Sequence, residues 1–221
     1  MVAADGAVAA VYPRAGRVAV AGPDGRLRFA RELTDPVAAL FAGGALWVAA
    51  HDGSALALAP GDGAVVAELP RGALHGARDL ALAGGLLLVA DAPRGAIVAI
   101  DPASGRVLGP VGDEARNGPV SVAADANAIY VAEVGAARVV VLDLDGRELA
   151  ALGGYGRGPG QMLAPRCVRV DARGHVFVLD RVAACVHELD AAHRSVARHA
   201  IAPGSAVDWL ARDTDGAVSW A

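Results

Sequence analysis

The chain has 221 residues, of which 54% are hydrophobic and 20% are charged, and its mean hydropathy is +0.40. This composition supports a sizeable core and excludes an intrinsically disordered chain. The formal net charge is −4 and all 20 basic residues are arginine, which argues against nucleic acid as the partner.

The sequence predicts no membrane insertion, because no apolar run approaches the roughly 18 residues that a membrane-spanning helix needs. Residues 1–10 carry Asp5 and contain no basic residue ahead of their apolar stretch, which is not the pattern of a secretory signal. We therefore expect a cytoplasmic protein, or a secreted or particle-associated one if the chain is a fragment of a longer protein.

Four similar segments follow one another along the chain with a period of about 42 residues. They begin at residues 36, 77, 119 and 165, and a shorter fifth segment begins at residue 206. Self-similarity at such a period is the sequence signature of a repeat architecture.

Each repeat is predicted to contain short strands separated by turns rich in Gly and Asp. Ahead of the segment that begins at residue 36, the expected strands are residues 7–12, 16–21 and 26–31. In the later repeats the third strands are expected at residues 54–59, 96–100, 138–142 and 184–189, and the fourth at 64–69, 106–111, 147–152 and 194–200. Glycine supplies positive φ in such turns, and aspartate stabilises them by bonding to nearby backbone. Most of these strands are apolar at nearly every position, which predicts that both faces are buried.

Four-stranded sheets that repeat at this period describe the blades of a β-propeller. We predict a single all-β propeller domain with five or six blades, at residues 1–35, 36–76, 77–118, 119–164 and 165–205, with a partial blade at 206–221. Residues 206–212 are alternatively the missing first strand of the first blade. The high alanine content favours helices, but glycine-containing turns interrupt every long stretch, and only residues 190–202 keep a helical alternative.

The stretch LGGYGRGPGQ at residues 152–161, followed by PRCVRVDARGHVFVLD at 165–180, resembles a unit of the NHL-repeat family. This stretch and the family unit share a Gly-rich linker, then a proline followed by alternating apolar residues and an Asp, and then a second strand whose last residue is Asp. The other repeats resemble the family more loosely. After the second strand the family usually has Asp-x-x-Asn-x-Arg, of which this chain keeps only the acid and the arginine, at Glu133 and Arg138.

NHL-like propellers include peptide- and protein-docking domains, RNA-binding domains, lactone hydrolases, streptogramin-type lyases and amidating lyases. The resemblance therefore implies the fold and does not select an activity.

Arginines on the connections between blades, together with one tyrosine, form the candidate binding set. Arginine pairs with carboxylates through two parallel hydrogen bonds, and tyrosine and arginine are enriched where interfaces derive most of their energy. We predict a non-catalytic scaffold without a cofactor, monomeric or a module of a larger protein, that binds a protein or peptide partner. The predicted binding residues are Arg78, Arg116, Tyr155, Arg157 and Arg166.

The alternative is a metal-dependent lactone hydrolase or lyase on the same fold. It would use His51, His75, Asp79 and Asp91 to hold a divalent cation such as Ca²⁺ or Zn²⁺. No pair among the six histidines has the sequence spacing of a zinc site. No Gly-x-Ser-x-Gly motif is present to support a hydrolase with a serine nucleophile.

Asp91, Glu133 and Asp180 occupy the same position in three successive repeats. They could form a ring of carboxylates around a hard cation, or each could bind loop amides within its own blade, which is the interpretation we favour. Cys167 and Cys185 fall on the first and third strands of one blade, too far apart for a disulfide, and are expected to be buried.

Overall fold

A computed structural model describes residues 3, 5–112, 115–202, 210–212 and 217–220. The described chain consists of antiparallel β-sheets and two single-turn 3₁₀ helices, η1 (Pro13–Ala15) and η2 (Val134–Ala136). Two compact units follow one another, Met1–Pro110 and Val111–Ala221. Among the described residues, no helix has the length and apolar character that crossing a membrane requires.

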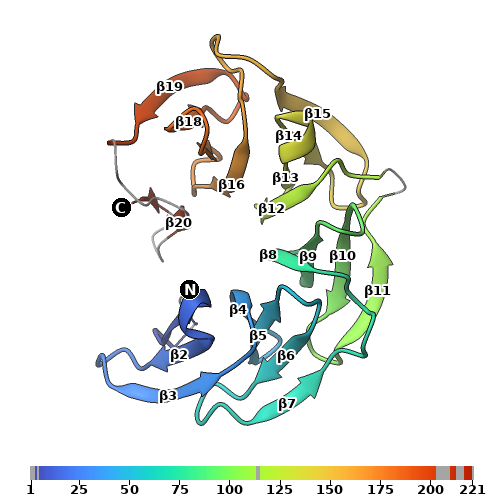
Figure 1. The fold of residues 1–221 in the computed structure, drawn as a ribbon, viewed down its shortest axis with the longest axis vertical. Helices are drawn as coiled ribbons and strands as arrows, with labels where there is room; N and C mark the ends of the chain where they lie inside the picture. Colours follow the sequence, from blue (N-terminus) through green and yellow to red (C-terminus); the bar gives the residue numbers. More distant parts are fainter. Residues whose placement is uncertain (1–2, 4, 113–114, 203–209, 213–216, 221) are drawn as a thin grey trace. The chain divides into compact units, whose positions relative to one another are not determined.

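The first unit contains three sheets, within each of which the strands lie side by side in chain order (Figure 1). The first has three strands, β1 (Val8–Tyr12), β2 (Arg17–Ala21) and β3 (Leu27–Glu32). The second has four, β4 (Pro36–Ala42), β5 (Ala45–Ala50), β6 (Ala55–Leu58) and β7 (Val65–Glu68). The third consists of β8 (Ala77–Ala83), β9 (Leu86–Asp91), β10 (Ala96–Asp101) and β11 (Arg106–Pro110).

The second unit contains two four-stranded sheets and a two-stranded one. The fourth sheet of the chain consists of β12 (Pro119–Ala124), β13 (Ile129–Glu133), β14 (Arg138–Leu142) and β15 (Glu148–Gly153). The fifth consists of β16 (Pro165–Val170), β17 (Val176–Asp180), β18 (Cys185–Leu189) and β19 (Ser195–Ala200). The last pairs β20 (Ala211–Arg212) with β21 (Val218–Ser219).

These strands lie within one or two residues of the segments that the sequence predicts. The helical alternative for residues 190–202 is wrong, because β19 pairs with β18 along its length. Most of residues 206–212, the segment proposed to complete the first sheet, lies outside the described residues.

The second strand of each four-stranded sheet is buried at nearly every residue, whereas the fourth strand is largely exposed. Both faces of the inner strands are therefore covered, as their continuous apolar sequences predict. Small alanine side chains fill much of each core, with a few large ones between them, such as Trp47 in the first unit and Met162 in the second.

The register between the first and second strands of a sheet determines where the candidate site lies. In three sheets a proline begins the first strand and lies opposite the last residue of the second, and a bulge follows; the pairs are Pro36↔Ala50, Pro119↔Glu133 and Pro165↔Asp180, of which the last two place an acidic residue there. Proline is tolerated at the first residue of a strand because its missing N–H removes no internal ladder bond. The acidic residue that ends the second strand is thereby held beside the connection that enters its own sheet.

Candidate functional site

Three buried carboxylates hold the connections that enter three of the sheets. Asp91 accepts the backbone N–H groups of His75 at 2.9 Å and Gly76 at 3.2 Å. Asp180 accepts those of Leu163 at 2.6 Å and Ala164 at 3.1 Å.

Glu133 accepts the backbone N–H of Asn117 at 3.3 Å. Like Asp91 and Asp180, it has no measurable solvent exposure. The interpretation that each carboxylate binds loop amides of its own sheet is confirmed. Each of these side chains thus ties the connection that enters a sheet to the end of the second strand of that sheet.

Arg116 belongs to this structural network. Its side chain is 2% exposed, and its Nη1 lies 3.9 Å from Glu133 and 3.5 Å from Glu148. Arg138 also reaches both acids, with Nε 2.8 Å from Glu133. We expected Arg116 at an exposed binding surface, and the structure instead buries it among ion pairs. The reason is the length of its side chain, which carries the guanidinium from the connection down to the end of β13.

Tyr155, by contrast, projects into solvent, with 80% of its surface exposed. The connection that carries it is well ordered by its own hydrogen bonds. Gly156 donates to the carbonyl of Met162 and Met162 donates to that of Gly154, each at 3.0 Å. The side chain of Met162 is completely buried and anchors this connection to the core.

Arg157 and Arg166 are exposed on the same connection and at the start of β16. The end of the connection lies close to the turn after β17, since the backbone N–H of Arg181 donates to the carbonyl of Ala164 at 3.4 Å. Tyr155 and Arg157 lie on the connection, and Arg166 lies on β16, the strand that the connection enters. Arg78, the remaining predicted binding residue, lies in the first unit on β8.

The four residues assigned to a metal site all lie in the first unit, but they bind other groups. His51 Nε2 contacts the Arg78 guanidinium, and His75 Nε2 lies 3.4 Å from Arg94 Nη2. Asp79 is buried and accepts the N–H of Leu80, while Asp91 binds loop amides. No group of three or more acidic, His or Cys side chains with metal-binding geometry occurs within the described ranges.

The fifth sheet contains a buried polar cluster that sequence reasoning missed. His187 Nε2 lies 3.4 Å from Cys185 Sγ and 3.7 Å from Asp180 Oδ2, and all three residues are buried. Residues 185 and 187 share one face of β18, so the two-residue spacing was the available signal.

This cluster lacks the geometry of a catalytic triad, in which the histidine faces its two partners through different ring nitrogens. Burial also raises the pKa of the Cys185 thiol, although Arg198 Nε lies 3.0 Å from its sulfur. A thiol in that state is not an activated nucleophile. Cys167 and Cys185 are both buried and both free, as the sequence predicts.

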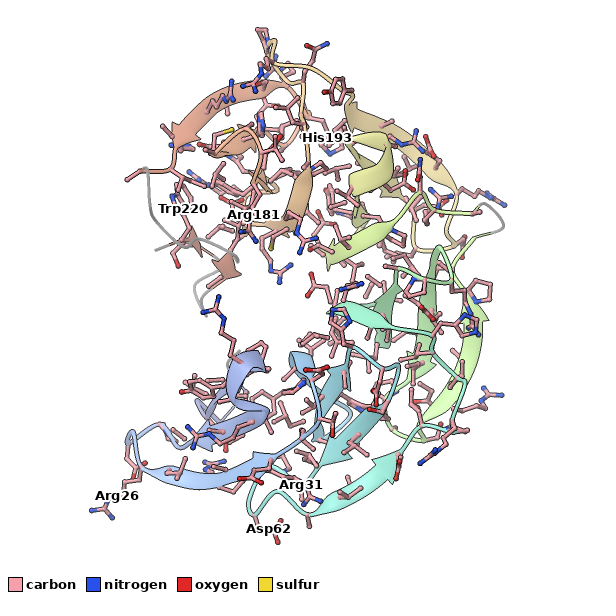
Figure 2. The ribbon with its side chains drawn as sticks, in the orientation of Figure 1. Arg26, Arg31, Asp62, Arg181, His193 and Trp220 are labelled. Carbon is pink, nitrogen blue, oxygen red and sulfur yellow. The ribbon has the colours of Figure 1, made fainter. Side chains whose placement is uncertain are left out.

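A second cluster, which includes Trp220 (labelled in Figure 2), contains His175 just before β17, Glu188 on β18 and His199 on β19. Glu188 bridges two histidines, with Oε1 3.0 Å from His175 Nδ1 and Oε2 2.8 Å from His199 Nε2. The His199 ring lies 5.2 Å from the Trp220 ring. Trp220 also approaches Phe177, at 6.3 Å between ring centroids, so it joins β21 to the fifth sheet.

Comparison with known proteins shows the fold. No protein-family model matches the chain, and no curated protein sequence is similar to it. Among solved structures, a streptogramin B lyase superimposes with a TM-score of 0.78 at 14% identity, covering 100% of this chain and 74% of the lyase. A catalytically inactive virginiamycin B lyase from Staphylococcus aureus with quinupristin gives 0.75 at 15%, covering 96% and 72%.

Hydrazine synthase from Kuenenia stuttgartiensis gives a TM-score of 0.67 at 20% identity, covering 84% of this chain and 55% of that one. At these identities the similarity shows the fold and carries no activity. The expectation of an all-β propeller is confirmed: the chain is a β-propeller of five blades, the first of which has three strands among the described residues.

Proposed function

We propose that this chain is an NHL-like propeller that binds an acidic peptide segment of a partner protein through the connection that carries Tyr155. The observation that supports this proposal is the 80% exposure of Tyr155 on a connection held by its own hydrogen bonds and by buried Met162. An exposed tyrosine whose backbone is already held in place can be covered by a partner with little further loss of backbone conformational entropy.

The neighbouring charges define the chemistry of the partner. Arg157 is exposed two residues after Tyr155, Arg166 is exposed on the strand that this connection enters, and both can form paired hydrogen bonds with carboxylates. Arg116 is excluded from this surface because it is buried. The expected ligand is therefore a segment that alternates acidic and aromatic residues.

The test measures fluorescence anisotropy of a fluorescein-labelled peptide of alternating Glu and Phe. Replacing both Tyr155 and Arg157 with alanine is expected to weaken binding by at least about tenfold, as for a pair of interface hot spots. The control is Tyr12→Ala. Tyr12 is 45% exposed in the first unit and packs against Arg17 at 5.3 Å, so it is another exposed tyrosine–arginine pair. Equal weakening by both changes would refute the proposed surface.

The second candidate is the metal-dependent lyase, and the observation that favours it is the similarity to streptogramin-type lyases. It requires a cation held by His51, His75, Asp79 and Asp91, whose side chains bind arginines and backbone amides here. Liquid chromatography coupled to mass spectrometry of quinupristin incubated with the protein and Ca²⁺, Mg²⁺, Mn²⁺ or Zn²⁺ tests it. A new product of unchanged mass that no longer forms after addition of a chelator would support the lyase, a product heavier by one water would indicate a hydrolase instead, and no product with any ion would exclude this substrate.

A further inference from the structure

The connection that carries Tyr155 is rich in glycine, and one polar side chain lies inside it. Four of the seven residues from Gly154 to Gly160 are glycine. Glycine loses more conformational freedom on folding than any other residue, so a segment of this composition needs added contacts to keep one conformation. The side chain of Gln161 supplies such contacts.

Gln161 folds back over the two glycines that flank Arg157. Its Oε1 accepts the backbone N–H of Gly158 at 2.9 Å, and its own backbone N–H donates to the Gly158 carbonyl at 3.0 Å. A Cβ added to Gly156 would lie 2.1 Å from Gln161 Oε1, and one added to Gly158 would lie 2.9 Å from the same oxygen. The amide of Gln161 therefore occupies the space beside both glycines.

The far end of this connection is fixed to the core by Met162, whose side chain is completely buried. The backbone of Met162 forms an isolated parallel bridge with Tyr155, which fixes the backbone of the tyrosine. Arg157 lies beyond this bridge, between the two glycines that Gln161 contacts. The backbone of Tyr155 is therefore held by Met162, and that of Arg157 is held by the side chain of Gln161.

We propose that Gln161 is the positioning residue of the peptide-binding connection, because it holds the backbone of Arg157 in the conformation that meets a carboxylate of the partner. This inference rests on the function proposed above. Without the Gln161 amide, residues 156–160 sample many conformations, and the partner has to order them as it binds. Loss of the amide should therefore weaken binding by at least about fivefold, although no group that touches the partner is removed.

Trypsin cleavage of the Arg157–Gly158 bond measures the order of this connection without any ligand, because proteolysis requires local opening of the segment. The variant Gln161→Met keeps the length of the side chain but removes the acceptor oxygen, whereas Gln161→Glu keeps an acceptor. We expect cleavage after Arg157 to be at least about fivefold faster in Gln161→Met and to return close to the unchanged rate in Gln161→Glu. Cleavage after Arg26, whose side chain is 91% exposed on the turn between β2 and β3, is the internal reference.

The labelled peptide of alternating Glu and Phe then tests whether this order matters for binding. Gln161→Met should weaken its binding by at least about fivefold. The control is Asn127→Ala, which removes another exposed amide of the same unit, on the turn between β12 and β13, and should leave binding unchanged. The melting temperature of each variant checks that the fold is intact.

The two measurements separate the failure of this inference from the failure of the proposed function. If the unchanged chain does not bind the peptide, the proposed function is refuted, and the role of Gln161 in binding with it, while the cleavage rates still show whether Gln161 orders the connection. If the unchanged chain binds, two results overturn the inference alone. One is cleavage after Arg157 that is as slow in Gln161→Met as in the unchanged chain. The other is a loosened connection that binds the peptide as tightly as before.

Discussion

The carboxylate of Asp180 accepts the backbone N–H of Leu163 at 2.6 Å, although 17 residues separate them. This bond joins the end of β17 to the connection that enters its own sheet. Asp180→Asn keeps the shape of the side chain but removes its charge and one acceptor oxygen. We expect the free energy of unfolding to fall by about 2–3 kcal/mol, because buried N–H groups lose their partner. Urea denaturation at pH 7 measures it.

The control for this change is Asp62→Asn. Asp62 also accepts a backbone N–H, that of Ala64 at 3.0 Å, but it lies on an exposed turn (Figure 2). Its replacement should change stability by no more than about 0.5 kcal/mol. Equal losses from the two variants would contradict a special role for the buried carboxylate.

The same residue predicts how stability depends on pH. Burial by itself raises the pKa of Asp180, but His187 and the backbone N–H groups of Leu163, Ala183 and Ala164 outweigh burial, and the pKa lies well below its ordinary value. A carboxyl whose pKa is lowered by folding contributes stability above its unfolded pKa, about 3.9, and that contribution is lost as the pH falls further. The melting temperatures of the unchanged chain and Asp180→Asn should therefore differ by a constant amount from pH 7 to about pH 4, and converge as the pH falls from about 4 to about 2. A difference that stays constant down to about pH 2 would show that the charge is not what matters.

Arg116→Gln should destabilise the protein, because Arg116 is a buried partner of Glu133. The change removes a buried guanidinium 3.9 Å from Glu133, but Arg138 Nε stays 2.8 Å from the same acid, so the expected loss is about 1–3 kcal/mol. Arg157→Gln, on an exposed connection, should change the free energy of unfolding by less than about 0.5 kcal/mol. Thermal or urea denaturation of both variants gives the comparison, and similar stabilities would contradict the buried pairing.

Glu188→Gln should loosen the last sheet. His199 lowers the pKa of Glu188 the most, burial opposes this, and His175 adds to the lowering. Because the pairs are partly exposed, the expected loss is only about 1 kcal/mol. A double-mutant cycle with His199→Gln measures the coupling, and Trp220 fluorescence reports whether the ring leaves the sheet. A coupling energy of zero would show that the Glu188–His199 contact contributes no stability.

Gly43 and Gly84 form a matched pair in successive blades, with φ values of +58° and +55°. A Cβ added to Gly43 would lie 2.6 Å from the carbonyl oxygen of Pro102, whereas one added to Gly84 would meet nothing within 4 Å. Both alanine variants incur a similar backbone penalty of about 1 kcal/mol. Gly43→Ala should lose a further 1–2 kcal/mol, roughly, from the overlap. Equal melting temperatures would show that the neighbouring turn moves aside.

Strand positions could be predicted well because each depends on local information. The apolar run of β14 and the turn at residues 143–146 set the ends of that strand wherever the rest of the chain lies. The helical alternative at residues 190–202 failed because alanine propensity is weak beside the hydrogen bonds that β19 forms with β18.

The candidate site could be predicted only in part. The shared position of Asp91, Glu133 and Asp180 was visible from the repeat, and so was their role as acceptors for loop amides. The burial of Arg116 was not visible, because its partners Glu133 and Glu148 come from two strands that follow it in the chain.

The sequence by itself determined the all-β class, the period of the repeat and the position of nearly every strand, because turn residues and apolar runs act over a few neighbours. The tertiary structure alone decided which polar side chains meet. It placed Cys185, His187 and Asp180 in one buried cluster, and it set His51 against Arg78. Such contacts depend on how successive strands and loops pack, and residue spacing along the chain does not encode that packing.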